Sequence, residues 1–230
     1  MRRLTAARDV TRLEGFSDAV FGFAATLLVV SLEVPRSVPA LMEDLLGFIP
    51  FAVSFGALVT IWSIHHTFFR RYELEDRTTV VLNSVLLFVV LFYVYPLKFS
   101  VESFTATFFG IGDIAIQSAE ELAWMFLLYG AGWTAIFTCV SLMYRHAYRL
   151  RAALDLTPSE AFQARYLAGQ YFVLVAVGIL SMLLAWAQAG IIYGVPGIAY
   201  FLCGPLSYGF GVWMERNKPA LADPAPPEPD

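Results

Sequence analysis

Residues 12–30 read RLEGFSDAVFGFAATLLVV, a charged and polar opening that passes without a break into an apolar run. A helix of about 20 mostly apolar residues crosses the ~30 Å hydrocarbon core of a bilayer. Asp18 already lies inside this run, where a carboxylate costs free energy unless it is paired or hydrogen-bonded. We therefore expect Asp18 to point into protein and to find polar partners there.

The composition of the whole chain indicates a membrane protein. Of its 230 residues 58% are hydrophobic and 15% are charged, whereas soluble domains are typically about 45–50% apolar and about 25% charged. The two cysteines, Cys139 and Cys203, lie in apolar runs without Cys/His spacing and are read as core thiols. We expect no metal, cofactor or catalytic site, and the net charge of −4 gives no reason to expect nucleic acid.

Several stretches are long and apolar enough to span a membrane. Lipid offers no hydrogen bonds to the backbone, so each should be a helix. The fold class predicted is an all-α membrane protein with six transmembrane helices. They are residues 13–34, 46–69, 79–99, 121–144, 166–188 and 190–214.

The prolines and glycines refine this prediction. A very short turn near Gly190 should join the last two spans into a tight hairpin, and Pro205 should kink the sixth helix. Pro35, Pro39 and Pro96 are expected near span ends, and Pro50 near the start of the second span, where a missing N–H costs little.

Basic residues gather at one set of span ends. The positive-inside rule then places both termini in the cytoplasm, and an even number of spans agrees. The opposite set holds two basic residues, Arg36 and Lys98, and seven acidic ones. The first set holds Arg2, Arg3, Arg8, Arg12, Arg70, Arg71, Arg77, Arg145, Arg149, Arg151, Arg165, Arg216 and Lys218.

Two segments lie outside the spans. Residues 100–120 form a long outer connection that is open to an amphipathic, interfacial interpretation. Residues 219–230 are rich in proline and acidic residues, and we expect a disordered tail after a single membrane domain over residues 1–218.

The first helix has two contrasting faces. Thr11 and Glu14 form a T-x-x-E capping box that predicts its start. At 100° per residue, small or polar residues gather opposite an apolar stripe, and small residues let membrane helices approach closely. We expect the small face, with Asp18, to pack against protein. The stripe is Phe16, Val20, Phe23, Leu27, Val30 and Val34, and the opposite face is Gly15, Asp18, Gly22, Ala25 and Val29.

Polar residues on three spans lie at a similar depth near the cytoplasmic side. Arg70 and Arg71 mark the interface on the second span, and Arg77 marks it on the third. We predict a buried polar network that fixes the first helix against the second and third. Its members are Arg12, Ser17, Asp18, Asn83 and either His65 or His66.

These residues also carry a resemblance. R-x-x-x-F-S-D at Arg12–Asp18, WSIHHTFFRRY with Trp62 and the His pair, and Asn83 in the third span together resemble the bacterial members of the transmembrane protein 175 family. Those proteins are potassium-permeable channels related to the endolysosomal channel of animals. The resemblance adds Phe16 and Trp62 to the structural network.

The resemblance implies a homotetramer in the bacterial cell membrane, because the chain carries one six-helix repeat. It implies that potassium permeates along the first helices, with an apolar constriction at Phe23, Leu27 and Val30 and a pore-facing Thr26. These three apolar residues also belong to the apolar stripe of the first helix that the 100° spacing predicts. Phe23 departs from the Ile or Leu that is commoner in the family, which leaves the pore width open.

The histidines and the six spans also raise two other function classes. A membrane enzyme or metal protein using His65, His66 and His146 is disfavoured, because adjacent helical histidines point about 100° apart and no HExxH motif is present. A proton-coupled or proton-permeable transporter is the alternative to a channel, although the sequence shows neither an internal repeat nor a charge at mid-bilayer.

Overall fold

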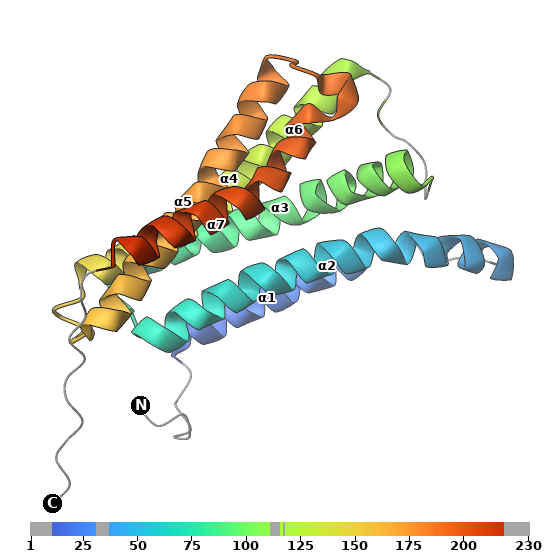
Figure 1. Ribbon diagram of the computed structural model, residues 1–230. Helices are drawn as coiled ribbons and strands as arrows, with labels where there is room; N and C mark the ends of the chain where they lie inside the picture. Colours follow the sequence, from blue (N-terminus) through green and yellow to red (C-terminus); the bar gives the residue numbers. More distant parts are fainter. Residues whose placement is uncertain (1–10, 31–36, 111–115, 117, 219–230) are drawn as a thin grey trace, which may run out of the picture. The chain divides into compact units, whose positions relative to one another are not determined.

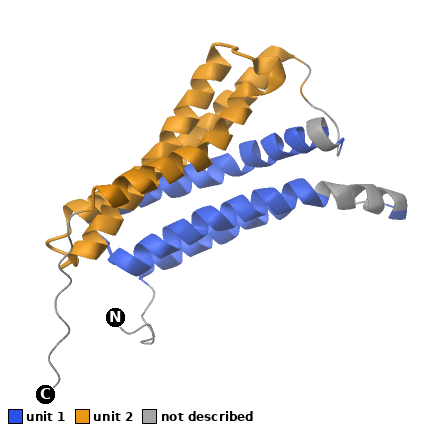
Figure 2. Ribbon diagram, in the orientation of Figure 1, with its two compact units in different colours: residues 1–114 blue, residues 115–230 orange. Residues whose placement is uncertain are grey.

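The structure, a computed structural model, describes residues 11–30, 37–110, 116 and 118–218, and for residues 39–47 and 107–109 it describes the backbone alone. This part of the chain is helical and contains no strand (Figure 1). It divides into two compact units, residues 1–114 and residues 115–230 (Figure 2). The predicted all-α fold class is confirmed.

The first unit is built from α1 (Arg12–Val30), α2 (Val38–Tyr72) and α3 (Arg77–Phe109), and each of these helices contacts the other two. Its core is made of large apolar and aromatic side chains from all three helices. Where the helices meet water, the burial of these side chains stabilises their packing through the hydrophobic effect. Within lipid, close van der Waals contact between the helices stabilises it instead. They include Phe21, Leu28, Leu58, Phe68, Phe69, Leu86 and Val90.

Local hydrogen bonds define where the helices of the first unit begin. The Glu14 N–H donates to Thr11 Oγ1 at 3.2 Å, and the Thr11 N–H donates to Glu14 Oε2 at 3.3 Å, so the predicted capping box is present. Asp76 caps α3 by accepting from the Thr78 N–H at 3.0 Å. These bonds satisfy N–H groups that the first helical turn leaves without partners.

The second unit centres on the antiparallel pair α4 (Ala119–Arg149) and α5 (Pro158–Trp186). The two backbones approach closely at Gly178, where an added Cβ would lie 2.5 Å from Thr134 Oγ1. The Ser141 hydroxyl donates to the Ala168 carbonyl at 2.7 Å, and the Trp133 indole N–H donates to the Leu174 carbonyl at 3.0 Å. Small residues and interhelical hydrogen bonds are the usual means by which helices associate in lipid.

The end of the second unit corrects the predicted tight hairpin at Gly190. After α5 the chain forms three short elements, η1 (Ile191–Tyr193), α6 (Val195–Ile198) and η2 (Ala199–Leu202), before α7 (Cys203–Arg216) packs on α5. Gly190 and Gly194 adopt left-handed backbone conformations, with φ of 62° and 67°. Pro205 lies in the first turn of α7, so the irregularity precedes this proline and the predicted kink at it is wrong.

Six helical segments are apolar and long enough to cross a membrane, as predicted. Several exceed the predicted spans. Pro50 lies inside α2 but at the third residue of the membrane-spanning part Phe48–Tyr72, near the start of the span as predicted. Pro96 lies inside α3 rather than near its end, and α3 continues through residues 100–109 of the presumed connection. Residues 111–115 and 117, Pro35 and the tail 219–230 lie outside the described residues.

Candidate functional site

One face of α1 packs within the first unit. Ser17, Ala24 and Leu28 are completely buried, and Phe21 is nearly so. Their spacing of four, three and four residues forms a single helical stripe. This stripe is the buried part of the surface by which α1 contacts α2 and α3, and the stripe that carries Asp18 and Gly22 meets α2 less closely.

A second face of α1 lies outside this packing. Phe23 is 57% exposed and Val30 is 72% exposed, while Thr26 is exposed and Leu27 is half-buried. The Thr26 hydroxyl donates to the Gly22 carbonyl at 2.9 Å, so its oxygen keeps lone pairs that can accept from or coordinate another group. Phe16, at the start of the same stripe, is 62% exposed. The predicted apolar stripe is therefore open on the surface of the chain.

The predicted small-residue face of α1 is not the face that the structure buries. Gly15, Asp18 and Gly22 are exposed, and a Cβ added to either glycine would meet no atom of the part of the chain that the structure describes within 4 Å. Val29 on the same face is 51% exposed. The buried stripe is displaced by about 100° from the predicted one, which is the angle between neighbouring residues of a helix. The displacement follows from Ser17, whose side chain turns into the unit.

A polar chain crosses all three helices of the first unit. The Asn83 amide N–H of α3 donates to Ser17 Oγ of α1 at 2.9 Å, and the Ser17 hydroxyl donates to the Leu13 carbonyl at 2.7 Å. Asn83 Oδ1 lies 2.8 Å from His65 Nε2 of α2. Because this oxygen is an acceptor, Nε2 carries the hydrogen and donates. His65, and not His66, therefore joins α1 to α3 through Asn83.

The three side chains of this bridge are almost completely buried. Ser17 and Asn83 are 0% exposed and His65 is 2% exposed. The His65 ring also contacts Phe21, with ring centroids 5.4 Å apart, and Phe69, at 4.7 Å. A buried polar group without a partner costs about 1–3 kcal/mol, so these bonds fix how α1 is rotated against its neighbours.

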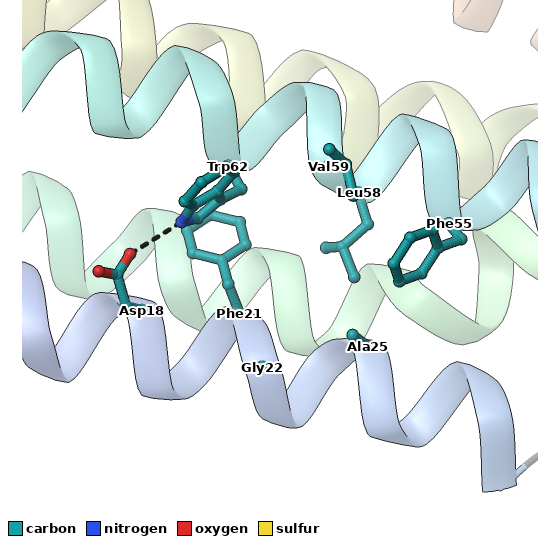
Figure 3. A pocket seen from close by; sticks show the side chains of 8 residues that line it. All are labelled: Asp18, Phe21, Gly22, Ala25, Phe55, Leu58, Val59 and Trp62. Atoms are coloured by element: carbon teal, nitrogen blue, oxygen red, sulfur yellow. Dashed lines mark hydrogen bonds between the residues drawn. The ribbon is translucent and has the colours of Figure 1, made fainter.

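Asp18 has a different partner from the one predicted. The Trp62 indole N–H of α2 donates to Asp18 Oδ1 at 2.8 Å (Figure 3). The His66 ring stacks on Trp62 with centroids 5.3 Å apart. The single network that we predicted is thus two arrangements, a buried bridge through Asn83 and an exposed pair of Asp18 and Trp62.

Asp18 and Trp62 stand at one end of an open groove between α1 and α2 (Figure 3). The groove has a volume of about 370 Å³. Apart from the Asp18 carboxylate and the Trp62 indole its lining is apolar. The lining residues are Asp18, Phe21, Gly22, Ala25, Phe55, Leu58, Val59 and Trp62.

Two predicted network residues take no part in these bonds. Arg12 is exposed and makes no hydrogen bond or ion pair with the described residues, and Phe16 faces outward. Sequence reasoning missed the burial of Glu14, which is 7% exposed, and the contact of Phe21 with His65. The capping box pointed to Glu14. The helical spacing of four and three residues from Ser17 to Phe21 to Ala24 would have pointed to Phe21 once Ser17 was placed inside.

Among the residues that the structure describes, no group of three or more His, Cys, Asp or Glu side chains is placed to hold a metal ion. Cys139 and Cys203 are free thiols. On its exposed side α1 offers an apolar stripe, the Thr26 hydroxyl and the Asp18 carboxylate that pairs with the Trp62 indole.

Comparisons with known proteins agree with this geometry. The family model of the endosomal/lysosomal potassium channel TMEM175 matches residues 12–93, the part of the chain that holds the buried bridge and the Asp18–Trp62 pair. A protein of Marivirga tractuosa named "Potassium channel" is 36% identical over 94% of this chain and 92% of its own length. A potassium channel of Chamaesiphon minutus is 28% identical over 80% of this chain and 90% of its own length.

A solved structure is also similar. The crystal structure of a variant of the potassium channel MtTMEM175, in complex with a Nanobody–MBP fusion protein, superposes with a TM-score of 0.80 and 34% sequence identity. The match covers 91% of this chain and 95% of that one, so it extends over both units. The chain therefore belongs to the TMEM175 family and resembles its bacterial members.

Proposed function

We propose that the protein is a potassium-permeable, modestly selective leak channel. The observation that carries this proposal is the exposed stripe of α1 in a chain whose relatives are named potassium channels. An apolar stripe on a membrane helix faces lipid, a partner helix or a pore. The family membership favours the pore, and it favours a channel over the proton-coupled transporter.

The pathway is formed by four copies of α1 around a shared axis. Phe23, Leu27 and Val30 then form stacked apolar rings, which gate by narrowness and by dewetting. They provide no cage of carbonyl or carboxylate oxygens, so selectivity rests on the dehydration cost of the ion and on the Thr26 hydroxyls. Potassium is favoured over sodium because it loses its water more easily.

Assembly as a homotetramer uses surfaces that the single chain leaves open. Gly15 and Gly22 lie on the side of α1 where no atom of the described residues fills the space of a Cβ. Small residues allow the close approach of membrane helices from different chains. The groove beside Gly22, with the Asp18–Trp62 pair at its end, offers a second copy an apolar surface next to a polar contact.

The chain lies in the bacterial cell membrane with both termini in the cytoplasm. The basic residues at the C-terminal ends of α2, α4 and α7 support this orientation, because Lys and Arg are enriched on the cytoplasmic side. Arg70 and Arg71 occupy the last turn of α2, and Arg149 and Arg216 those of α4 and α7.

Planar-bilayer recording of the purified full chain tests the function. With potassium on one side and sodium on the other, we expect ohmic single-channel steps whose reversal potential is shifted toward the potassium equilibrium potential. Protein inactivated by heat before reconstitution is the control and should give no steps. Flux that saturates with ion concentration and requires a pH gradient would contradict the channel and favour a transporter.

A further inference from the structure

The exposed face of α5 is about as long as the hydrocarbon core of a bilayer is thick. Phe172 is 63% exposed and Leu183 is 57% exposed, and Ile179 lies exposed between them. Arg165 and Trp186 lie on the same face at its two ends and are both exposed. They are 21 residues apart, which is about 31 Å along a helix and matches the ~30 Å hydrocarbon core.

A second arginine lies level with Arg165 on the neighbouring helix. Ser141 of α4 lies opposite Ala168 of α5, because its hydroxyl donates to that carbonyl. The two helices are antiparallel, so four residues further along α4 and three residues back along α5 bring Arg145 and Arg165 to the same level. Arg149 follows one turn beyond Arg145.

Helical geometry places these arginines on one face of the pair. At 100° per residue, Arg145 points about 60° away from the side of α4 that meets α5, and Arg165 points about 95° away from the side of α5 that meets α4. Because the helices are antiparallel, both rotations lead to the same outward side. Leu142 of α4 and Phe172 of α5, also exposed, lie on that side one to two turns further into the membrane.

The charges of this face are not neutralised within the described chain. Arg145, Arg149 and Arg165 are exposed and form no hydrogen bond or ion pair with any described residue. Arg151 differs, since its guanidinium lies 4.7 Å from the centre of the Tyr148 ring and donates to the Tyr148 carbonyl at 3.2 Å. Lys218 also differs, because it pairs with Glu215 at 3.4 Å.

We infer that Arg145 and Arg165, with Arg149, bind the phosphate of an anionic phospholipid whose acyl chains lie along Leu142 and Phe172. Arginine is suited to phosphate because its planar fork donates two parallel hydrogen bonds. Basic clusters at the cytoplasmic ends of membrane helices attract anionic headgroups. The site goes beyond the conduction pathway, since it is built by α4 and α5 and uses no residue of α1.

The position of the arginines favours a lipid over a free phosphate ion. The arginines adjoin an exposed apolar surface at the boundary of the membrane, where a headgroup and its chains are held together. A dissolved phosphate would gain nothing from Leu142 and Phe172. Charge complementarity and the apolar surface therefore select the same occupant.

Native mass spectrometry of the purified full chain tests this site. The protein is titrated with phosphatidylglycerol, with phosphatidylcholine of the same acyl chains, and with phosphatidylglycerol in the presence of inorganic phosphate. Wild-type protein should retain phosphatidylglycerol in preference to phosphatidylcholine, and inorganic phosphate should not displace it. The double variant Arg145→Gln/Arg165→Gln should bind phosphatidylglycerol on the order of tenfold more weakly.

Arg151→Gln is the matched control, because it removes the same charge at the same end of the unit from a side chain that has its own partners. It should leave lipid retention unchanged. If the double variant does not purify in folded form, the single variants should each weaken binding about threefold. Equal retention of both lipids, displacement by phosphate, unchanged binding in the arginine variants, or an equal loss in Arg151→Gln would each overturn the assignment.

Discussion

Replacing Asn83 with leucine is expected to destabilise the first unit by about 1–3 kcal/mol. The substitution keeps a side chain of similar size but removes the amide that joins Ser17 to His65. The His65 N–H is then buried without an acceptor. The midpoint of thermal unfolding of the purified protein in detergent, followed by tryptophan fluorescence, measures the loss.

Ser84→Ala provides the control for Asn83→Leu. Ser84 is the next residue of α3 and is exposed, and its hydroxyl donates to the Val80 carbonyl of its own helix at 2.8 Å. Its loss should leave the unfolding midpoint nearly unchanged. The cost of Asn83→Leu should also shrink in a His65→Leu background, because the group left unsatisfied is then absent. Additive effects of the two substitutions, or a midpoint equal to that of Ser84→Ala, would show that the bridge does not hold the helices.

Shortening Leu27 to alanine is expected to raise the potassium leak current several-fold. The substitution widens one apolar ring by three carbon atoms per chain, and wetting of a hydrophobic constriction depends steeply on its width. Phe23→Ala should act in the same direction and more strongly, because a ring of four phenyl groups is lost. Single-channel conductance and open probability in planar bilayers measure both effects.

Leu183→Ala serves as the matched control for these pore variants. Leu183 is an apolar residue of α5 that is 57% exposed, and its substitution removes the same three carbon atoms from a helix that takes no part in the proposed pore. The conductance of this variant should equal that of the wild type. A current that responds equally to Leu183→Ala and Leu27→Ala, or to neither, would place the constriction elsewhere.

The class of the fold and the site residues could be predicted because hydrocarbon restricts the chain so strongly. The spans follow from the requirement for backbone hydrogen bonding in lipid. Counting residues from the interfacial arginines put Ser17, Asn83 and the two histidines at one depth, and the structure joins Ser17, Asn83 and His65. The depth of a residue in the membrane depends only on how many residues separate it from the interface along its helix, so a sequence predicts it well.

Rotation of a helix about its own axis is much harder to predict. The choice between His65 and His66, and the displacement of the buried face of α1 by one residue, both depend on which side meets the neighbouring helices. Two neighbouring stripes of α1, one with Gly22 and Ala25 and one with Ser17 and Ala24, could each pack against other helices, and the sequence does not rank them. The Trp62 indole, which is the donor to Asp18, was placed in the network only by the resemblance and not as this partner.

The connection between α5 and α7 could not be read from hydropathy. Residues 187–202 are as apolar as a span, so the composition gave no break between the fifth and sixth helices. The break is indicated instead by glycine and proline, since Gly190, Gly194, Pro196 and Gly197 fall within eight residues. Such spacing favours turns and short helices over a single long one.

Covalent modification of a cysteine at Leu27 shows whether the exposed face of α1 lines the ion pathway. Cys139 and Cys203 are replaced with serine, and single-channel currents are recorded before and after a charged methanethiosulfonate reagent is added. We expect Leu27→Cys channels to be blocked, while Leu183→Cys channels of α5, labelled to the same extent by mass spectrometry, conduct as before. Unaltered current through fully labelled Leu27→Cys channels would contradict a pathway along this face.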